Sequence, residues 1–309
     1  MRVTLKELFI MRIVFMGTPE FARKSLDRLY SDGHDIAGVF TRADKPRNRG
    51  MKLSFTPVKE LALEHGSPVY QPVKLSAELF DDIDCELIAV VAYGRILPKE
   101  ILVLPELGCI NIHGSILPKY RGASPIQHAI LSGDKETGVT SMYMSEGIDD
   151  GDILYTRKTQ IGEDETAADL SERLGILGAG LLSDTIAMIG RGEAVRTPQD
   201  HNEATFAPLL TKEISPVDWS DSAYEIKCKI RGLIPWPVAT MELGGKVLKI
   251  FSADITANQT GKAPGTVVSH GRAGLEIACA DGTVIVKELQ APGGRRMLAA
   301  DYLRGNMIV

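Results

Sequence analysis

Short apolar runs alternate with longer amphipathic stretches over the first 190 residues of this 309-residue chain. The run at 87–92 lacks polar alternation, as expected of a strand buried on both faces of a sheet. Thr18, Thr56 and Thr166 are suited to cap the amphipathic stretches as helix N-caps. Alternating strands and helices predict an α/β fold with a Rossmann-like, doubly wound, mostly parallel sheet. We predict strands at 13–16, 36–40, 87–92, 109–113, 139–144 and 153–160, and helices at 19–31, 57–65, 124–131 and 166–189.

The pattern changes beyond residue 190. A polar stretch without periodicity at 191–207 predicts a linker, and a helix opened by Ser220 or Ser222 follows at 219–231. Five short strands with Gly-rich turns between them predict a small barrel. These strands are expected at 239–243, 247–253, 265–269, 274–279 and 283–290. We therefore expect a first domain at 1–190, a linker at 191–209 and a second domain at 210–309.

The composition is that of an ordinary soluble globular protein, with 44% hydrophobic and 24% charged residues. No apolar run approaches the ~18 residues that a transmembrane helix needs. Residues 1–10 are too short and too charged for a signal peptide and form a candidate N-terminal extension. The four cysteines form no Cys-x-x-Cys pair, which predicts reduced thiols in a cytosolic protein and no zinc site.

Charge is distributed unevenly around a net value of −5. Residues 210–309 carry 12 Lys or Arg and 10 Asp or Glu, whereas the rest of the chain is acidic. This asymmetry fits a chain that touches a phosphate backbone with one part only, although a difference this small also arises by chance. No Gly-x-Gly-x-x-Gly follows the first strand, which argues against a bound nicotinamide dinucleotide.

The candidate chemistry begins where the strand at 109–113 ends. Asn111 and His113 are two residues apart, so a strand directs both side chains to one face, and Gly114 then turns the chain. An amide donor beside an imidazole suits acyl transfer, which needs an oxyanion donor and a proton carrier. A histidine at a strand end is also often purely structural, and these two residues alone leave both interpretations open.

An acidic turn at 147–152 offers a partner for the imidazole. A carboxylate on such a turn can orient a nearby histidine and stabilise its cationic form. Acidic turns are also common without any such role. Spacing alone does not choose between Asp149, Asp150 and Asp152.

Several motifs in sequence order resemble the folate-dependent formyltransferases, from Met11 to the end of the chain. Asn-Ile-His-Gly-Ser-Ile-Leu-Pro at 111–118 is followed by the Ile-Asp-x-Gly-Asp turn at 148–152. The other matching stretches are 11–22, Val-Val-Ala-Tyr-Gly-Arg-Ile-Leu-Pro at 90–98, Arg-Gly-Ala-Ser-Pro-Ile-Gln at 121–127 and Pro-Trp-Pro at 235–237. The family's usual residue at position 116 is Leu, and Ile116 departs from it while keeping the side-chain volume.

The resemblance implies 10-formyltetrahydrofolate as formyl donor and co-substrate, with no metal and no NAD. It assigns catalysis to Asn111, His113 and Asp149, and it implies a cis Leu117–Pro118 peptide. The folate contacts that it implies are Val91, Tyr93, Gly94, Ser115, Ile116, Leu117 and Pro118. A purely structural packing role is the alternative for Tyr93.

The resemblance also implies the acceptor, which is the free amine of initiator methionyl-tRNA. In the family a basic loop inserts into the acceptor stem, and the corresponding loop at 41–53 holds five basic residues and one acid. The basic residues are Arg42, Lys45, Arg47, Arg49 and Lys52, and a plain solvated loop is the alternative. The second domain is expected to be an OB-like, tRNA-binding barrel. On the same grounds we expect a cytoplasmic monomer without a membrane partner.

Two other activities belong to the same chemistry. A formyltransferase could act on a small amine, such as a nucleotide sugar or glycinamide ribonucleotide, and a 10-formyltetrahydrofolate hydrolase would use water. A glycinamide-type enzyme usually ends near the linker, so residues 210–309 and the basic loop favour tRNA. A folate- or RNA-binding protein without activity is disfavoured, because such a protein would be free to lose Asn111, His113 and Asp149.

Overall fold

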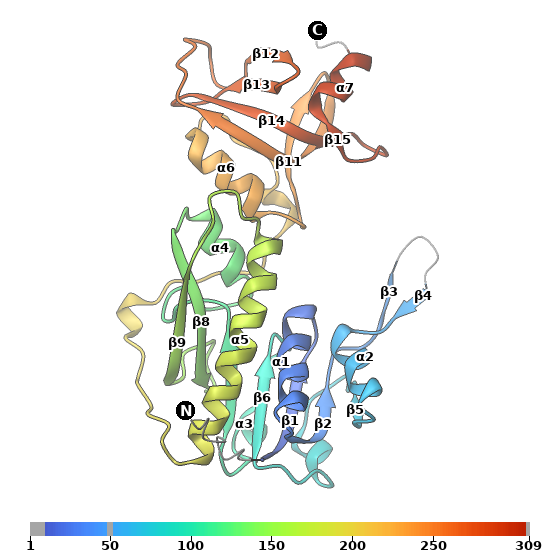
Figure 1. The fold of residues 1–309 in the computed structure, drawn as a ribbon, viewed down its shortest axis with the longest axis vertical. Coiled ribbons are helices and arrows are strands. Elements are labelled where there is room, and N and C mark those ends of the chain that lie inside the picture. Colours follow the sequence, from blue (N-terminus) through green and yellow to red (C-terminus); the bar gives the residue numbers. More distant parts are fainter. Residues whose placement is uncertain (1–9, 48–51, 307–309) are drawn as a thin grey trace, which may run out of the picture. The chain divides into compact units, whose positions relative to one another are not determined.

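The structure is a computed structural model that describes residues 10–47 and 52–306 (Figure 1). The chain forms two compact units. The first takes in the described residues up to Pro125, together with Thr137–Thr159 and Ser171–Ala207. The second takes in Ile126–Glu136, Gln160–Leu170 and the described residues from Pro208 onward.

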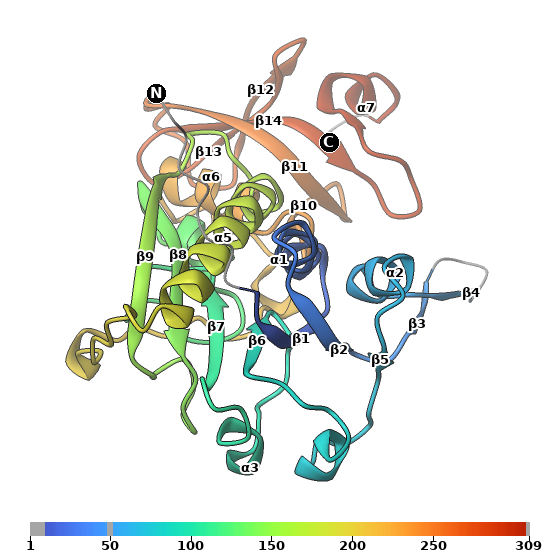
Figure 2. The same cartoon turned by 60° about the horizontal axis from the view of Figure 1, so that its bottom comes forward.

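A seven-stranded sheet organises the first unit, and its strands lie side by side in Figure 2. Their order is β5-β2-β1-β6-β7-β8-β9. The pairs β2–β5, β1–β2, β1–β6 and β6–β7 are parallel, and β8 runs antiparallel to β7. The predicted mostly parallel, doubly wound sheet is thereby confirmed. The bounds are β1 (Arg12–Gly17), β2 (Asp35–Phe40), β5 (Val69–Tyr70), β6 (Leu87–Val91), β7 (Cys109–His113), β8 (Glu136–Tyr143) and β9 (Ile153–Gln160).

The strand order reverses at β1. From β1 the chain continues to β2 on one side, whereas β6 and then β7 line up on the other side. In open α/β sheets, ligands bind outside the carboxyl ends of the strands at such a reversal. The carboxyl ends of β1 and β6 are therefore the place where a ligand site is expected, and β7 lies beside β6.

Most helices begin where the sequence predicts. The side chain of Thr56 caps α2 by accepting from the Lys59 N–H, and Thr166 accepts from the Asp169 N–H ahead of α5. Thr18 does not cap α1: the N-cap is Pro19, without a side-chain bond. Helix bounds are α1 (Glu20–Ser31), α2 (Pro57–Glu64), α3 (Lys99–Leu102), α4 (Pro125–Leu131) and α5 (Ala167–Gly190), with 3₁₀ turns at Ala77–Phe80, His201–Glu203 and Lys212–Ile214.

Tertiary partners explain the difference at Thr18. Its hydroxyl donates to the Tyr93 carbonyl and accepts from the Arg42 N–H, both at 3.4 Å. The side chain thus links the turn after β1 to the chain beyond β6 and to residue 42. A residue that looks like a local cap instead joins three segments near the carboxyl ends of the strands.

Helix α5 packs closely on the sheet in Figure 1. A Cβ atom at Gly178 would lie 3.0 Å from the Ile112 side chain and 3.7 Å from Val139, so glycine permits the close approach. By length and composition α5 could cross a membrane, with a mean hydropathy of 1.3, although we expected no such segment from the sequence. Half of the most apolar 18-residue stretch of α5 is buried inside the protein, so this helix is weak evidence for a membrane span.

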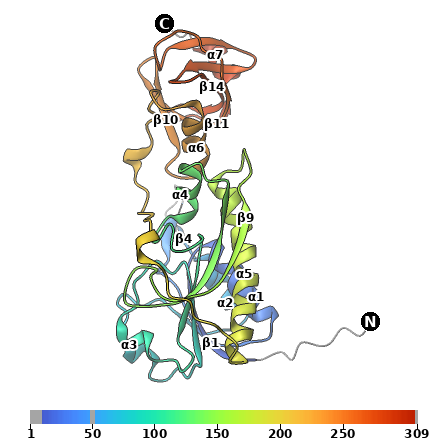
Figure 3. The same cartoon turned by 90° about the vertical axis from the view of Figure 1, so that its left-hand side faces the viewer.

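A second, antiparallel sheet organises the C-terminal unit, with the order β10-β11-β14-β13-β12 and β15 beside β14. Helices α6 and α7 pack on this sheet (Figure 3). The core includes Ile226, Leu248, Leu275 and Val286, all fully buried. The predicted small OB-like barrel is confirmed as the fold. Its elements are α6 (Ala223–Gly232), β10 (Ala239–Leu243), β11 (Lys246–Thr256), β12 (Val267–Gly271), β13 (Gly274–Ala278), β14 (Thr283–Gln290), β15 (Met297–Leu298) and α7 (Ala299–Gly305).

Helix α6 begins later than the predicted residue 219. Ser222 and Glu225 form a capping box, in which Ser222 accepts from the Glu225 N–H and Glu225 accepts from the Ser222 N–H. Ahead of it, Asp218 accepts from the Ser220 N–H and holds a turn instead of a helix. The choice between the two candidate caps therefore falls on Ser222.

Candidate active site

Asn111 and His113 are buried at the carboxyl end of β7, 8% and 5% exposed. They pair with Met142 and Thr140 of β8, and their spacing places them on one face of the strand. Among the described residues, the Asn111 side-chain amide makes no hydrogen bond. The amide is not among the fully enclosed side-chain groups that lack a partner, so it keeps some contact with solvent. The amide is therefore a donor that a bound substrate could satisfy.

Both ring nitrogens of His113 face oxygen atoms. Nε2 lies 2.8 Å from the Tyr120 carbonyl, and Nδ1 lies 3.5 Å from a carboxylate oxygen of Asp149. A carbonyl and an ionised carboxylate only accept hydrogen bonds. A ring that carries a proton on both nitrogens satisfies both contacts, so the surroundings suit a histidine that holds and passes a proton.

The structure distinguishes Asp149 from Asp150 in the acidic turn. Asp149 faces His113, and the same carboxylate oxygen accepts from the Gly122 N–H at 2.8 Å. Asp149 has φ +49°, a left-handed conformation that aspartate tolerates better than most residues. Asp150 instead accepts from the Ser145 hydroxyl. The resemblance-based choice of Asp149 thus coincides with the carboxylate beside the imidazole.

The segment 115–118 is held by Thr140 of β8. The Thr140 hydroxyl donates to the Ser115 carbonyl at 2.7 Å and accepts from the Leu117 N–H at 3.2 Å. The Leu117–Pro118 peptide is cis, as the resemblance implied. Ser115 and Leu117 are buried, whereas Ile116 and Pro118 are half-buried. The segment is therefore a fixed loop beside the ends of β7 and β8.

Val91, Tyr93 and Gly94 lie where β6 ends, next to β7. Tyr93 is 2% exposed, and its hydroxyl has no hydrogen-bond partner among the described residues. Burial raises the pKa of Tyr93, which keeps the hydroxyl neutral and able to donate. Gly94 has φ +75°, and its carbonyl accepts from the Arg42 guanidinium at 2.8 Å. The implied folate contacts thus lie on two segments, one after β6 and one after β7, and these two strands are neighbours.

The basic segment after residue 41 contains two short strands that pair with each other, here called the β3–β4 hairpin. β3 (Lys45–Arg47) pairs antiparallel with β4 (Lys52–Ser54), so Lys45, Arg47 and Lys52 lie on two short strands. Arg49 lies outside the described residues. Arg42 precedes the hairpin and bonds to Gly94, so its side chain is directed toward the end of β6.

Three further residues at the site escaped the sequence analysis. Thr140 holds the 115–118 loop, and buried Arg121 and Gln199 join the loops on either side of His113. Gln199 lies in the aperiodic polar stretch, where no pattern marks it. Arg121 lies within a matching motif, but motif membership alone does not indicate a role.

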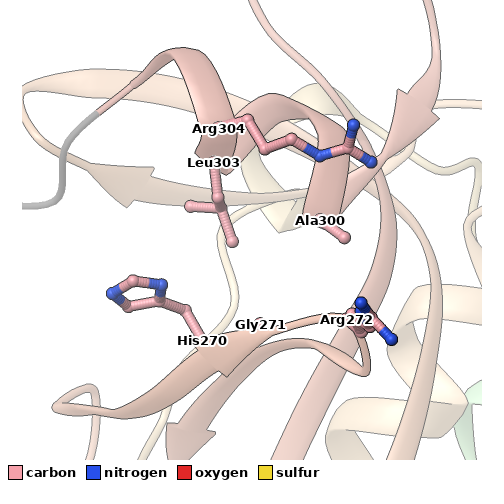
Figure 4. A pocket seen from close by; sticks show the side chains of 6 residues that line it. All are labelled: His270, Gly271, Arg272, Ala300, Leu303 and Arg304. Atoms are coloured by element: carbon pink, nitrogen blue, oxygen red, sulfur yellow. The ribbon is translucent and has the colours of Figure 1, made fainter.

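The C-terminal unit carries a hollow of about 500 Å³ (Figure 4). Strand β12 and the turn after it provide one side, with His270 and Arg272, and α7 provides the other, with Leu303 and Arg304. Arg304 also pairs with Asp301 at 2.5 Å. Two guanidinium groups and an imidazole make the hollow suited to an anionic ligand.

Among residues 10–47 and 52–306, no group of three or more His, Cys, Asp or Glu side chains could hold a metal ion. The cysteines Cys85, Cys109, Cys228 and Cys279 are all free thiols. Burial raises the pKa of Cys109 to about 12, so this thiol stays protonated and unreactive.

Comparisons with known proteins match both halves of the chain. The family model described as "Formyl transferase" matches residues 11–186, and "Formyl transferase, C-terminal domain" matches residues 209–307. Methionyl-tRNA formyltransferase from Alkaliphilus oremlandii is 47% identical over 302 residues, covering 96% of this chain and 97% of that protein.

Solved structures share the fold at lower identity. HypX from Aquifex aeolicus in complex with tetrahydrofolic acid is 21% identical with a TM-score of 0.63 over 95% of this chain, which spans 47% of HypX. Methionyl-tRNA formyltransferase from Clostridium thermocellum is 21% identical with a TM-score of 0.56, covering 81% of this chain and 96% of that one.

Proposed function

The chain belongs to the methionyl-tRNA formyltransferase family, and on that premise we propose that it transfers the formyl group of 10-formyltetrahydrofolate to the free amine of methionyl-initiator tRNA. The product, N-formylmethionyl-tRNA, serves translation initiation. One observation supports the chemistry: at the end of β7, His113 shares a strand face with Asn111, and its Nδ1 lies 3.5 Å from the Asp149 carboxylate.

The proposed reaction uses these groups as donors and proton carriers. The amine nitrogen attacks the formyl carbon, charge develops on the formyl oxygen, and the bond from that carbon to N10 then breaks. Asn111 donates a hydrogen bond to the oxygen where the charge develops. His113 donates a second hydrogen bond, or it passes a proton to N10 as that bond breaks and takes up the proton that the attacking amine loses. Asp149 orients the imidazole.

The proposed folate site lies at the ends of β6 and β7. The buried Tyr93 hydroxyl has no partner among the described residues and supports a ligand that offers a hydrogen-bond acceptor, and the Asn111 amide lies on the neighbouring strand. Backbone groups of Val91 and Gly94 would meet the pterin ring. The loop 115–118 would line the other side of the ligand.

The proposed domains are a catalytic domain at 1–190, a linker at 191–209 and a tRNA-binding domain at 210–309. The cationic hollow at His270, Arg272 and Arg304 supports RNA contact by the second domain. The basic group around the β3–β4 hairpin, including Arg42, would approach the acceptor end. We further propose a cytoplasmic monomer that needs no membrane.

An acceptor comparison tests the function. The purified full-length protein is incubated with 10-formyltetrahydrofolate and with charged initiator tRNA, elongator methionyl-tRNA or no amine, and formyl release is followed. Transfer to initiator tRNA alone is the expected result. Formyl release without any amine would identify a hydrolase. Transfer to a small amine but not to tRNA would identify a formyltransferase that acts on small amines.

A further inference from the structure

Two separate loops hold the two ring nitrogens of His113. The Tyr120 carbonyl meets Nε2, and the loop that carries it continues through Arg121 to Gly122. Asp149 meets Nδ1 from the turn between β8 and β9. The position of the imidazole therefore depends on the placement of these loops relative to each other.

Gln199 joins the two loops through one amide group. Its Nε2 donates to the carbonyls of Asp149 at 2.9 Å and Gly151 at 2.7 Å. Its Oε1 accepts from the Arg121 guanidinium at 3.1 Å to Nε and 2.7 Å to Nη2. Only this orientation of the amide places donors against carbonyls and an acceptor against the guanidinium.

The surroundings make this amide a fixed part of the site. Gln199 is 7% exposed and Arg121 is 4% exposed. The chain beside Gln199 is itself anchored, because Thr197 exchanges two backbone hydrogen bonds with Ile153 at the start of β9. All hydrogen-bonding groups of this side chain are engaged and it has little room to move. A displacement of one of the two loops would therefore displace the other.

We propose that Gln199 is a positioning residue for formyl transfer, setting the Asp149 carboxylate and the Tyr120–Gly122 loop against His113 through its two-sided amide. The proposal rests on the proposed function. It predicts that the amide matters for turnover more than for substrate binding, because its bonds go to the loops that hold His113 and Asp149.

A glutamate at position 199 separates positioning from packing. Gln199→Glu keeps the size of the side chain and still accepts from Arg121, but its carboxylate repels the Asp149 and Gly151 carbonyls. Gln199→Met serves as a second variant that removes both sets of bonds. Gln290→Glu, which loses one bond to the Gly294 carbonyl in the C-terminal unit, is the matched control.

The assay follows single-turnover and steady-state formyl transfer from 10-formyltetrahydrofolate to charged initiator tRNA. We expect Gln199→Glu to lower kcat roughly 10- to 100-fold, with KM for both substrates within about threefold, as for a misplaced catalytic group. The control should keep the kcat of the unsubstituted chain. Combined with Asp149→Asn, Gln199→Glu should lower kcat by less than the product of the two single effects, because both changes disturb the position of the Asp149 carboxylate.

Three results would overturn the proposal: an unchanged kcat, fully additive losses in the double variant, or losses that follow thermal unfolding and disappear at lower temperature. The unsubstituted chain reports on the proposed function separately. If the unsubstituted chain transfers no formyl group to tRNA, the proposed function fails. If it is active and substitution of Gln199 leaves kcat unchanged, only the role of Gln199 is rejected.

Discussion

At the scale of single residues, the proposed chemistry rests on a few buried polar groups. Asn111 has an amide without a partner, and His113 has both nitrogens engaged. The two residues would respond differently to a bound substrate. The Asn111 amide would gain a hydrogen bond, whereas the His113 imidazole would have to give up an existing contact to form a new one. The amide is therefore the simpler group to test.

Replacing Asn111 by alanine removes the proposed oxyanion donor. We expect the single-turnover rate to fall by roughly 10²–10³, with a modest change in folate affinity, because the bond strengthens as charge develops. Rapid-quench measurement at saturating folate checks this. A variant that turns over at the normal rate would remove Asn111 from the reaction.

Replacing Asp149 by asparagine keeps the shape but removes the charge beside His113. We expect a rate loss on the order of 10²–10⁴, because the imidazole loses the carboxylate that orients it. Asp150→Asn is the matched control, since Asp150 bonds to Ser145 and should change the rate only a few-fold. Equal losses in both variants would contradict the assignment of Asp149.

At the scale of elements, β8 supports the neighbouring loop as well as the sheet. Thr140 bonds two backbone groups of the 115–118 loop while its own backbone pairs with His113. One strand residue thus fixes both the end of β7 and the loop that would line the folate.

Replacing Thr140 by valine leaves the Ser115 carbonyl and the Leu117 N–H without this partner. Losing such buried bonds costs about 1–3 kcal/mol, so we expect a higher KM for 10-formyltetrahydrofolate, a smaller change for tRNA and a lower melting temperature. Thr156→Val is the control, because Thr156 meets Thr140 at 3.4 Å without holding the loop. A rise in KM for tRNA alone would count against this assignment.

The sequence predicts those elements whose signals are local. The bounds of β7 match the prediction, and Thr56 caps its helix, because apolar runs and caps act through neighbouring residues. Thr18 does not cap its helix because its hydroxyl forms hydrogen bonds with residues distant in sequence. Gln199 could not be predicted, because its partners come from loops 48 to 78 residues away in sequence and its own segment has no periodicity.

At the scale of the whole molecule, the two units have different folds and different candidate ligands. The first has a mostly parallel sheet whose strand ends carry buried donors, and the second has a small antiparallel barrel with a cationic hollow. This division fits a reaction between a small donor and a large anionic acceptor, with each ligand recognised by its own chemistry.

Replacing Arg272 by alanine tests the hollow. We expect KM for charged tRNA to rise, KM for folate to stay constant, and the slope of log affinity against log salt to fall by about 1, as for one lost phosphate contact. Arg28→Ala on α1 removes one exposed charge from the first unit and should leave the slope unchanged. An unchanged slope for Arg272→Ala would contradict a role of the hollow in RNA binding.

The two outer strands of the seven-stranded sheet affect how this chain behaves at high concentration. One outer strand, β5, has only two residues, and the other, β9, carries Arg157 and Lys158 along its middle. Short or charged outer strands offer a poor template for pairing with a strand from another molecule. The sheet thereby resists the edge-to-edge growth that leads to aggregation, while its interior strands stay apolar enough to form the core.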